Sequence, residues 1–150
     1  MIQNSFVHRL SRVVVEVMFY GGILCCLTLP WAMPLLGELM NYGVEILRPL
    51  TFMLLLLGLC ALYILWQLKA MFRTLVGGDP FVAANVSSLR KCALASFIIA
   101  GIFFVKEILW FNLLTATYII IFALLGLFCL TLKDLFKQAV AYKEENDWTV

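Results

Sequence analysis

Charged residues are scarce in this sequence. Only 13% of its 150 residues are Asp, Glu, Lys or Arg, whereas 64% are hydrophobic and the mean hydropathy is +1.01. Soluble domains carry about 25% charged residues, so a deficit this large indicates a protein whose solvent is the lipid bilayer. The formal net charge of +2 is small and is divided among hydrophobic runs, which argues against direct binding of nucleic acid.

Side chains that perform catalysis or bind metals are also few. His8 is the single histidine, and the five cysteines lie within or beside apolar runs without forming a Cys-x-x-Cys pair. The cysteines therefore read as small buried hydrophobes and support neither a disulfide framework nor a zinc site. The sequence has no Gly-x-Ser-x-Gly, no His-Glu-x-x-His and no phosphate-binding loop. We expect a non-enzymatic protein without a metal or cofactor.

Long apolar runs are what the sequence has in abundance. Four of them are each close to the 20 residues that a helix needs to cross a hydrocarbon core about 30 Å thick. They predict an all-α, polytopic membrane protein of one domain, with spans at about 13–36, 49–68, 92–109 and 113–132. The first run is long for a signal peptide and lacks a good small-residue cleavage site, so we interpret it as a span whose prolines, Pro30 and Pro34, lie at its exit from the membrane.

Lys and Arg residues predict the orientation of these spans. Nine of the eleven fall on one side of the predicted membrane, beside the two termini and the segment 69–91, and only Arg48 and Lys106 fall on the other. By the positive-inside rule, both termini and segment 69–91 are cytoplasmic. We therefore expect a multi-pass protein of the cell (inner) membrane, with Trp31, Trp110 and Phe111 at the outer interface.

Segment 69–91 is expected to be a structured cytoplasmic connector. The pair Gly77-Gly78 can end the incoming helix, Asp79 is a suitable N-cap, and Pro80 suits the first position of a new helix. Three residues then recur at intervals of four, on one face of an amphipathic helix, and two basic residues follow: Phe81, Asn85 and Leu89, then Arg90 and Lys91. This helix is either a docking surface or a structural elbow that rests on lipid headgroups.

The cytoplasmic tail is expected over 133–150, and its first part, 133–145, is expected to continue the last span as a helix. Apolar residues follow a helical period there, and the segment ends in a polar cluster of three acidic residues and one asparagine: Glu144, Glu145, Asn146 and Asp147. An electrostatic clasp between this tail and the basic residues Arg73, Arg90 and Lys91 would be weak, since exposed ion pairs contribute about 0–1 kcal/mol each.

Glu16 lies near the start of the first span. A carboxylate within a membrane indicates function by default, and small drug–proton exporters also have four short helices with an essential Glu in the first. Glu16 also lies four residues after Arg12, at the spacing of a helical ion pair. We prefer the ion pair, and keep a small oligomeric transporter with Glu16 as its coupling carboxylate as the alternative.

Two segments resemble a known family. Gly78 to Arg90 is similar to the central pattern of the bacterial membrane proteins grouped as domain of unknown function 2975, in which Gly-x-Pro-Phe is followed by Asn and then Leu-Arg at this spacing. The end of the chain, Glu145-Asn-Asp-Trp-Thr-Val150, resembles the family's ending. Trp148 is the departure, because a smaller aliphatic residue is usual at that place.

The family has no established activity. Its members are often encoded beside a small helix-turn-helix regulator of the Cro/repressor type, which implies a membrane partner that holds or releases a cytoplasmic DNA-binding protein. We therefore expect a cytoplasmic recognition face with Asp79 and Pro80 fixing its helix. Its contacts would come from the connector and the tail: Phe81, Asn85, Leu89, Arg90, Glu144, Glu145, Asn146 and Asp147. A structural alternative uses the same residues to join the connector to the tail within the protein.

Overall fold

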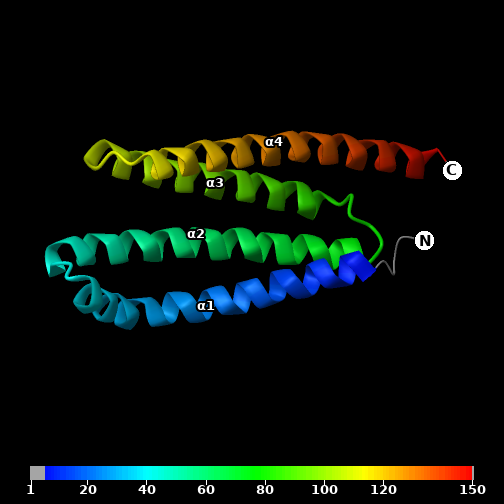
Figure 1. Ribbon diagram of the computed structural model, residues 1–150. Helices are drawn as coiled ribbons and strands as arrows, with labels where there is room; N and C mark the ends of the chain where they lie inside the picture. The colour runs from blue at the N-terminus through cyan, green and yellow to red at the C-terminus, as the bar shows by residue number, and fades with distance from the viewer. Residues whose placement is uncertain (1–5, 150) are drawn as a thin grey trace.

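The computed structural model describes residues 6–149, which form four helices and no strand (Figure 1). The helices are α1 (Phe6–Met40), α2 (Val44–Val76), α3 (Ala83–Leu109) and α4 (Leu113–Trp148). Each helix is long and apolar enough to cross a membrane, so the expected all-α, four-helix membrane fold is confirmed. Each predicted span falls inside one of these helices, and the points where the helices enter and leave the bilayer stay predictions.

The helices form an open row of two antiparallel hairpins. α1 packs on α2, α2 on α3, and α3 on α4, while no other pair of helices within residues 6–149 is in contact. The connector between α2 and α3 lies at the same end of the molecule as the start of α1 and the end of α4 (Figure 1). We call this end the connector end, and the end with the two short turns the opposite end.

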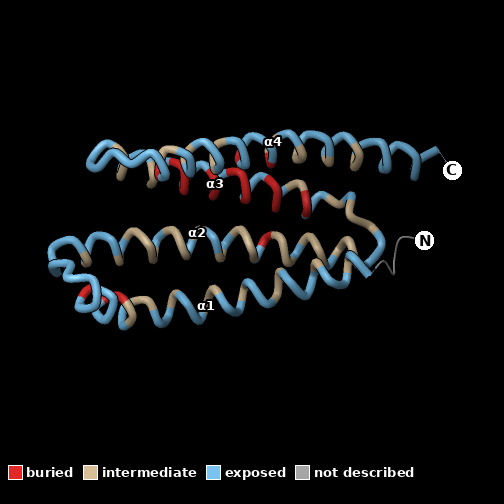
Figure 2. The backbone as a smooth tube through the Cα atoms, in the orientation of Figure 1, coloured by how far each residue is buried: buried red, intermediate tan, exposed pale blue. Residues whose placement is uncertain are grey.

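Most buried residues lie on α3, between its two neighbours (Figure 2). Ala95, Ser96 and Ala100 are buried, as expected for small residues that allow helices to approach closely. A β-carbon at Gly126 of α4 would lie 2.9 Å from an aromatic ring of α3, so this hairpin is in tight contact. Gly101, in the same helix, is exposed.

Three prolines lie inside helices. α1 continues past Pro30 and Pro34, and Pro49 lies within α2. The expectation that Pro30 and Pro34 lie where the first span leaves the membrane stays a prediction. Proline is tolerated inside membrane helices because neighbouring groups and local adjustments satisfy the freed backbone carbonyls. α1 ends at Met40 instead, where Asn41 takes a left-handed conformation with φ 56°. Asparagine adopts this conformation more readily than most residues.

The end of α2 follows the sequence expectation. Gly77 caps the helix. Gly78 has φ 96°, a backbone conformation that residues other than glycine rarely adopt. Gly78 N donates to Leu75 O at 3.2 Å, and Asp79 N donates to Thr74 O at 3.3 Å. These two bonds form a Schellman motif, which satisfies the last carbonyls of the helix.

The start of α3 differs from the prediction. Phe81 N donates to Asp79 Oδ1 at 3.3 Å, which is the bond expected of an N-cap, but the backbone stays extended at Val82 (φ −122°, ψ 150°) and the helix begins at Ala83. The assignment of Asp79 as N-cap and Pro80 as first helical residue is therefore wrong. Asp79 forms a turn by bonding the amide two residues on, and α3 begins without a side-chain cap. The connector helix is the first part of α3 rather than a separate element.

Candidate functional site

Asn85 is the central polar residue of the connector. Its side chain is only 2% exposed, and its amide nitrogen donates to Thr74 Oγ1 at 2.6 Å and to Pro80 O at 2.7 Å. Thr74 belongs to the last turns of α2, and Pro80 belongs to the loop. One buried amide therefore joins the end of α2, the loop and the start of α3.

Leu89 lies one turn further along α3 and is 4% exposed. The sequence placed Asn85 and Leu89 on one helix face with Phe81, and this face is turned into the protein. Neither residue can contact a docked partner in this conformation. The Asn85 bonds join the connector to α2 and not to the tail, so they do not form the connector-to-tail link of the structural alternative.

Two contacts join the connector to α4. The Phe81 and Phe136 rings meet edge to face, with centroids 5.3 Å apart. The Lys143 ammonium donates to Asp79 Oδ2 and forms an ion pair with it. This hydrogen bond, together with the charge of Lys143 and the Phe81 N–H, lowers the pKa of Asp79 below its ordinary value of 3.8, against a smaller opposing effect of desolvation.

The polarity of this ion pair is opposite to the expected clasp. The tail was expected to provide acidic groups to basic connector residues, but Asp79 of the connector pairs with Lys143 of the tail. Within residues 6–149, no ion pair joins Arg90 or Lys91 to a carboxylate of the tail. The acidic tail residues and both basic residues stay exposed: Arg90, Lys91, Glu144, Glu145, Asn146 and Asp147.

A small hollow lies between the connector and α4. Its volume is about 220 Å³, and its walls include Phe81, Val140, Lys143 and Asp147. The hollow is bordered by the two contacts described above and lies beside the exposed acidic residues. Among the candidate residues, Phe81 packs against α4 through Phe136. It is also 42% exposed, so part of its ring belongs to the accessible surface.

Glu16 lies on α1, in the hairpin away from these residues. Its Oε1 is 3.4 Å from Arg12 Nε, four residues earlier, and both side chains are partly exposed. The ion pair preferred from the sequence is present. Among residues 6–149, no group of three His, Cys, Asp or Glu side chains is placed to hold a metal ion.

Sequence reasoning missed several residues of this site. Lys143 pairs with Asp79, 64 residues earlier, and this pairing has no signal in the sequence. Thr74 was not noticed at all, although it accepts the Asn85 amide. Phe136 was recognised as part of the apolar period of the tail, and that period was the available signal for a packed face.

The model of one family, described as "Protein of unknown function (DUF2975)", matches residues 8–150. No curated protein and no solved structure matches the chain.

Proposed function

Because this chain belongs to the DUF2975 family, whose description gives no activity, we propose a function from the form of its connector end. It is a non-enzymatic, multi-pass membrane protein whose connector end holds a cytoplasmic protein. A small helix-turn-helix transcription regulator is the kind of partner that we expect. The positive-inside bias of Lys and Arg supports a cytoplasmic location for this end.

The observation that carries the proposal is the extension of α4. The helix continues to Trp148, so the part from Lys133 onward runs for about 24 Å beyond the last apolar span, at 1.5 Å per residue. This extension passes beyond the start of α3 at the connector end (Figure 1). Phe136 and Lys143 attach it to the connector. It therefore presents its outer face on a rigid element, as a recognition site requires.

The exposed groups on this end suit a protein partner. Trp148 is 89% exposed, and tryptophan is among the residues that contribute most to protein interfaces. Acidic residues of the tail and basic residues of α3 lie on the same end, and both signs of charge remain unpaired within the described residues: Glu144, Glu145 and Asp147, with Arg90 and Lys91. Such groups steer and orient a charged partner.

Photo-crosslinking tests the proposal with two exposed tryptophans. A photoreactive amino acid replaces Trp148 at the connector end or Trp110 (71% exposed) at the opposite end, in the full chain in native membranes. We expect a crosslink from position 148 to a soluble DNA-binding protein and none from position 110. The double variant Glu144→Gln, Glu145→Gln should weaken this crosslink, whereas Glu38→Gln, Glu45→Gln at the opposite end should not. Crosslinks from position 148 to lipid or to the chain itself alone would contradict docking and favour the structural alternative.

The transport alternative depends on Glu16. Glu16→Gln removes its charge with little change in size and is therefore expected to leave the crosslink from position 148 unchanged. Loss of a proton-coupled flux in reconstituted vesicles on this substitution would instead support a transporter.

A further inference from the structure

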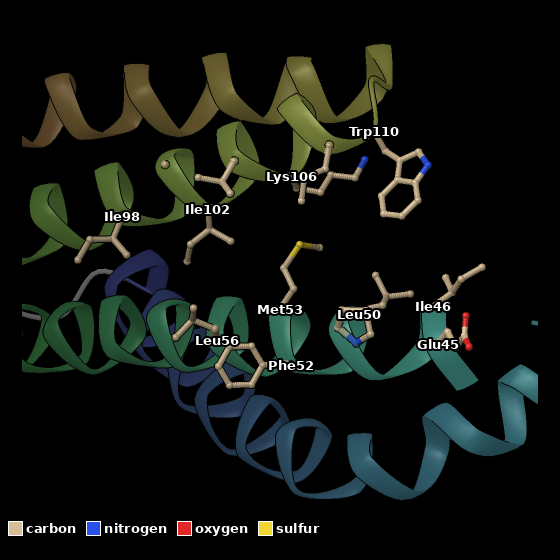
Figure 3. Close-up of a pocket in the computed structure, with 14 residues that line it drawn as sticks. Glu45, Ile46, Leu50, Phe52, Met53, Leu56, Ile98, Ile102, Lys106 and Trp110 are labelled. Atoms are coloured by element: carbon tan, nitrogen blue, oxygen red, sulfur yellow. The ribbon is translucent and has the colours of Figure 1, made fainter. Parts of the chain in front are cut away.

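A large apolar groove lies between α2 and α3, toward the opposite end of the molecule (Figure 3). Its volume is about 840 Å³, within the range of small-molecule binding sites. Met53 and Leu56 of α2 face Ile98 and Ile102 of α3 across it. The groove is remote from the connector, so it plays no part in the docking proposed above.

The protein does not fill this groove with its own side chains. Gly101 lines the α3 wall, and a β-carbon placed there would have no atom within 4 Å. α2 and α3 belong to different hairpins, and within residues 6–149 the groove is lined by residues of α2 and α3 and by Trp110, with no residue of α1 or α4 in its lining. In a bilayer, an open apolar groove of this kind is accessible to lipid tails, which are as apolar as leucine.

The groove is polar at one end only. Glu45 of α2 and Lys106 of α3 lie at the same end, beside Trp110, while Leu56 and Ile98 line the other end (Figure 3). Lys106 Nζ donates to Thr115 Oγ1 at 2.9 Å, which leaves two of its three donors for another acceptor. Neither Lys106 nor Glu45 has an ion-pair partner within residues 6–149. One unpaired cation and one unpaired anion thus line the mouth from facing walls.

The length of the groove fits one leaflet. Its lining runs from Glu45 to Leu56 on α2 and from Ile98 to Leu109 on α3, about 17 Å on each wall at 1.5 Å per residue. Half of a hydrocarbon core about 30 Å thick is about 15 Å. A transmembrane helix of a second copy would need a surface that spans both leaflets, whereas an acyl chain of a single lipid needs only one.

We propose that this groove binds one phospholipid whose headgroup carries a phosphate and a primary amine. Its acyl chain lies between α2 and α3, past Met53 and Gly101. The phosphate accepts hydrogen bonds from Lys106, and the ammonium donates to the Glu45 carboxylate. Both are charge-assisted bonds, which are stronger than neutral ones. Trp110 lies at the level of the headgroup, where tryptophan is enriched in membrane proteins.

Native mass spectrometry of the full chain tests this proposal. The protein is reconstituted with an equal mixture of phosphatidylethanolamine, phosphatidylcholine and phosphatidylglycerol, then released from mild detergent. We expect one retained phosphatidylethanolamine per chain. Equal retention of the three lipids would overturn the proposed headgroup recognition.

Gly101→Leu fills the groove and should lower lipid retention by about tenfold, since the acyl chain loses its place. Gly21→Leu is the matched control, because Gly21 is an exposed helical glycine on α1 whose β-carbon would also meet nothing within 4 Å. Unchanged retention in Gly101→Leu, or equal loss in both variants, would overturn the proposal. A wild-type dimer that Gly101→Leu converts to a monomer would also overturn it and assign the groove to a second copy.

The headgroup residues are tested separately. Glu45→Gln should reduce the preference for phosphatidylethanolamine over phosphatidylglycerol by about tenfold, the effect of losing one charged hydrogen bond. Lys106→Gln should lower the retention of all three lipids. A lipid preference unchanged by Glu45→Gln would contradict the assignment of the amine to this carboxylate.

Discussion

Asn85 is the residue whose role the structure changes most. In the sequence it belongs to an amphipathic pattern on a membrane-surface helix. In the fold it is buried, and it bonds the end of α2 and the loop at the same time. A buried amide with both of its hydrogens donated fixes a loop more firmly than an exposed polar contact does, because losing it leaves buried acceptors without donors.

Asn85→Ala should therefore destabilise the protein by about 2 kcal/mol, since Pro80 O loses its buried donor. Thermal unfolding in detergent can be followed by the reaction of a thiol-specific dye with buried Cys92. Ser87→Ala is the control, because Ser87 is exposed in the same turn of α3. Equal melting temperatures for the two variants would show that the amide bonds contribute nothing.

The ion pair of Asp79 and Lys143 predicts a pH dependence. The pKa of Asp79 is lower in the folded protein than its ordinary value of 3.8, because Lys143 favours the charged carboxylate. The folded state thus binds this proton less readily, so the pair stabilises the protein fully above pH 3.8 and loses its effect as the pH falls through the lowered pKa. We expect the spectroscopic distance between labels at the connector and α4 to be constant from pH 8 to 5 and to lengthen only in stronger acid.

Asp79→Asn is the control for this titration. Its amide carries no charge at any pH, so the label distance should lose the acid step. An acid step of the same size in Asp79→Asn would assign the change to another group.

At the scale of elements, the extension of α4 depends on its contact with the connector. Phe136→Ala removes the edge-to-face ring pair, which is worth about 1 kcal/mol beyond its buried area. Tryptic cleavage at Lys137 should become about fivefold faster, because local opening of the helix becomes more frequent. Leu135→Ala is the matched control, since Leu135 directly precedes Phe136 in the helix and is 55% exposed. Equal acceleration in both variants would mean that the ring pair does not hold the extension.

The elements themselves could be predicted from the sequence because each run is long and predominantly apolar, with few charged residues inside it. The ends of the helices were harder to predict than the helices themselves. Pro30, Pro34 and Pro49 are breakers in water, but a membrane helix tolerates them, so a rule that holds for soluble helices fails at these three positions. α1 ends instead at Met40, just before Asn41. Because asparagine also occurs inside helices, Asn41 alone does not predict this helix end.

The candidate site was predictable only in part. The motif from Gly78 to Arg90 was recognised, and the glycine pair ends α2 as expected. Which face of the early α3 would be buried could not be derived, because the partner surface comes from Thr74 of α2 and from α4, far away in sequence. The groove between Glu45 and Lys106 was missed for the same reason, since these residues are neighbours only through the packing of two hairpins.

At the scale of the whole molecule, the orientation in the membrane is the prediction to test. Two cysteine variants can report the orientation: Trp110→Cys introduces a thiol at the opposite end, and Thr149→Cys introduces one at the connector end. A membrane-impermeant maleimide added to intact cells should label the first and not the second, because the positive-inside bias predicts that the connector end is cytoplasmic. Permeabilised cells provide the control, in which both should react. Labelling of Thr149→Cys in intact cells would reverse the orientation.

The open row of helices also bears on how the chain is made. Within residues 6–149, each helix packs only on helices that are adjacent to it in sequence. Each helix from α2 onward therefore meets a partner that has already been synthesised, and no helix waits for any helix later than the next one. Contacts of short sequence separation form fast, because little loop entropy is lost in closing them. The order of synthesis is then the order of assembly, and the first hairpin can be complete before α4 has been translated.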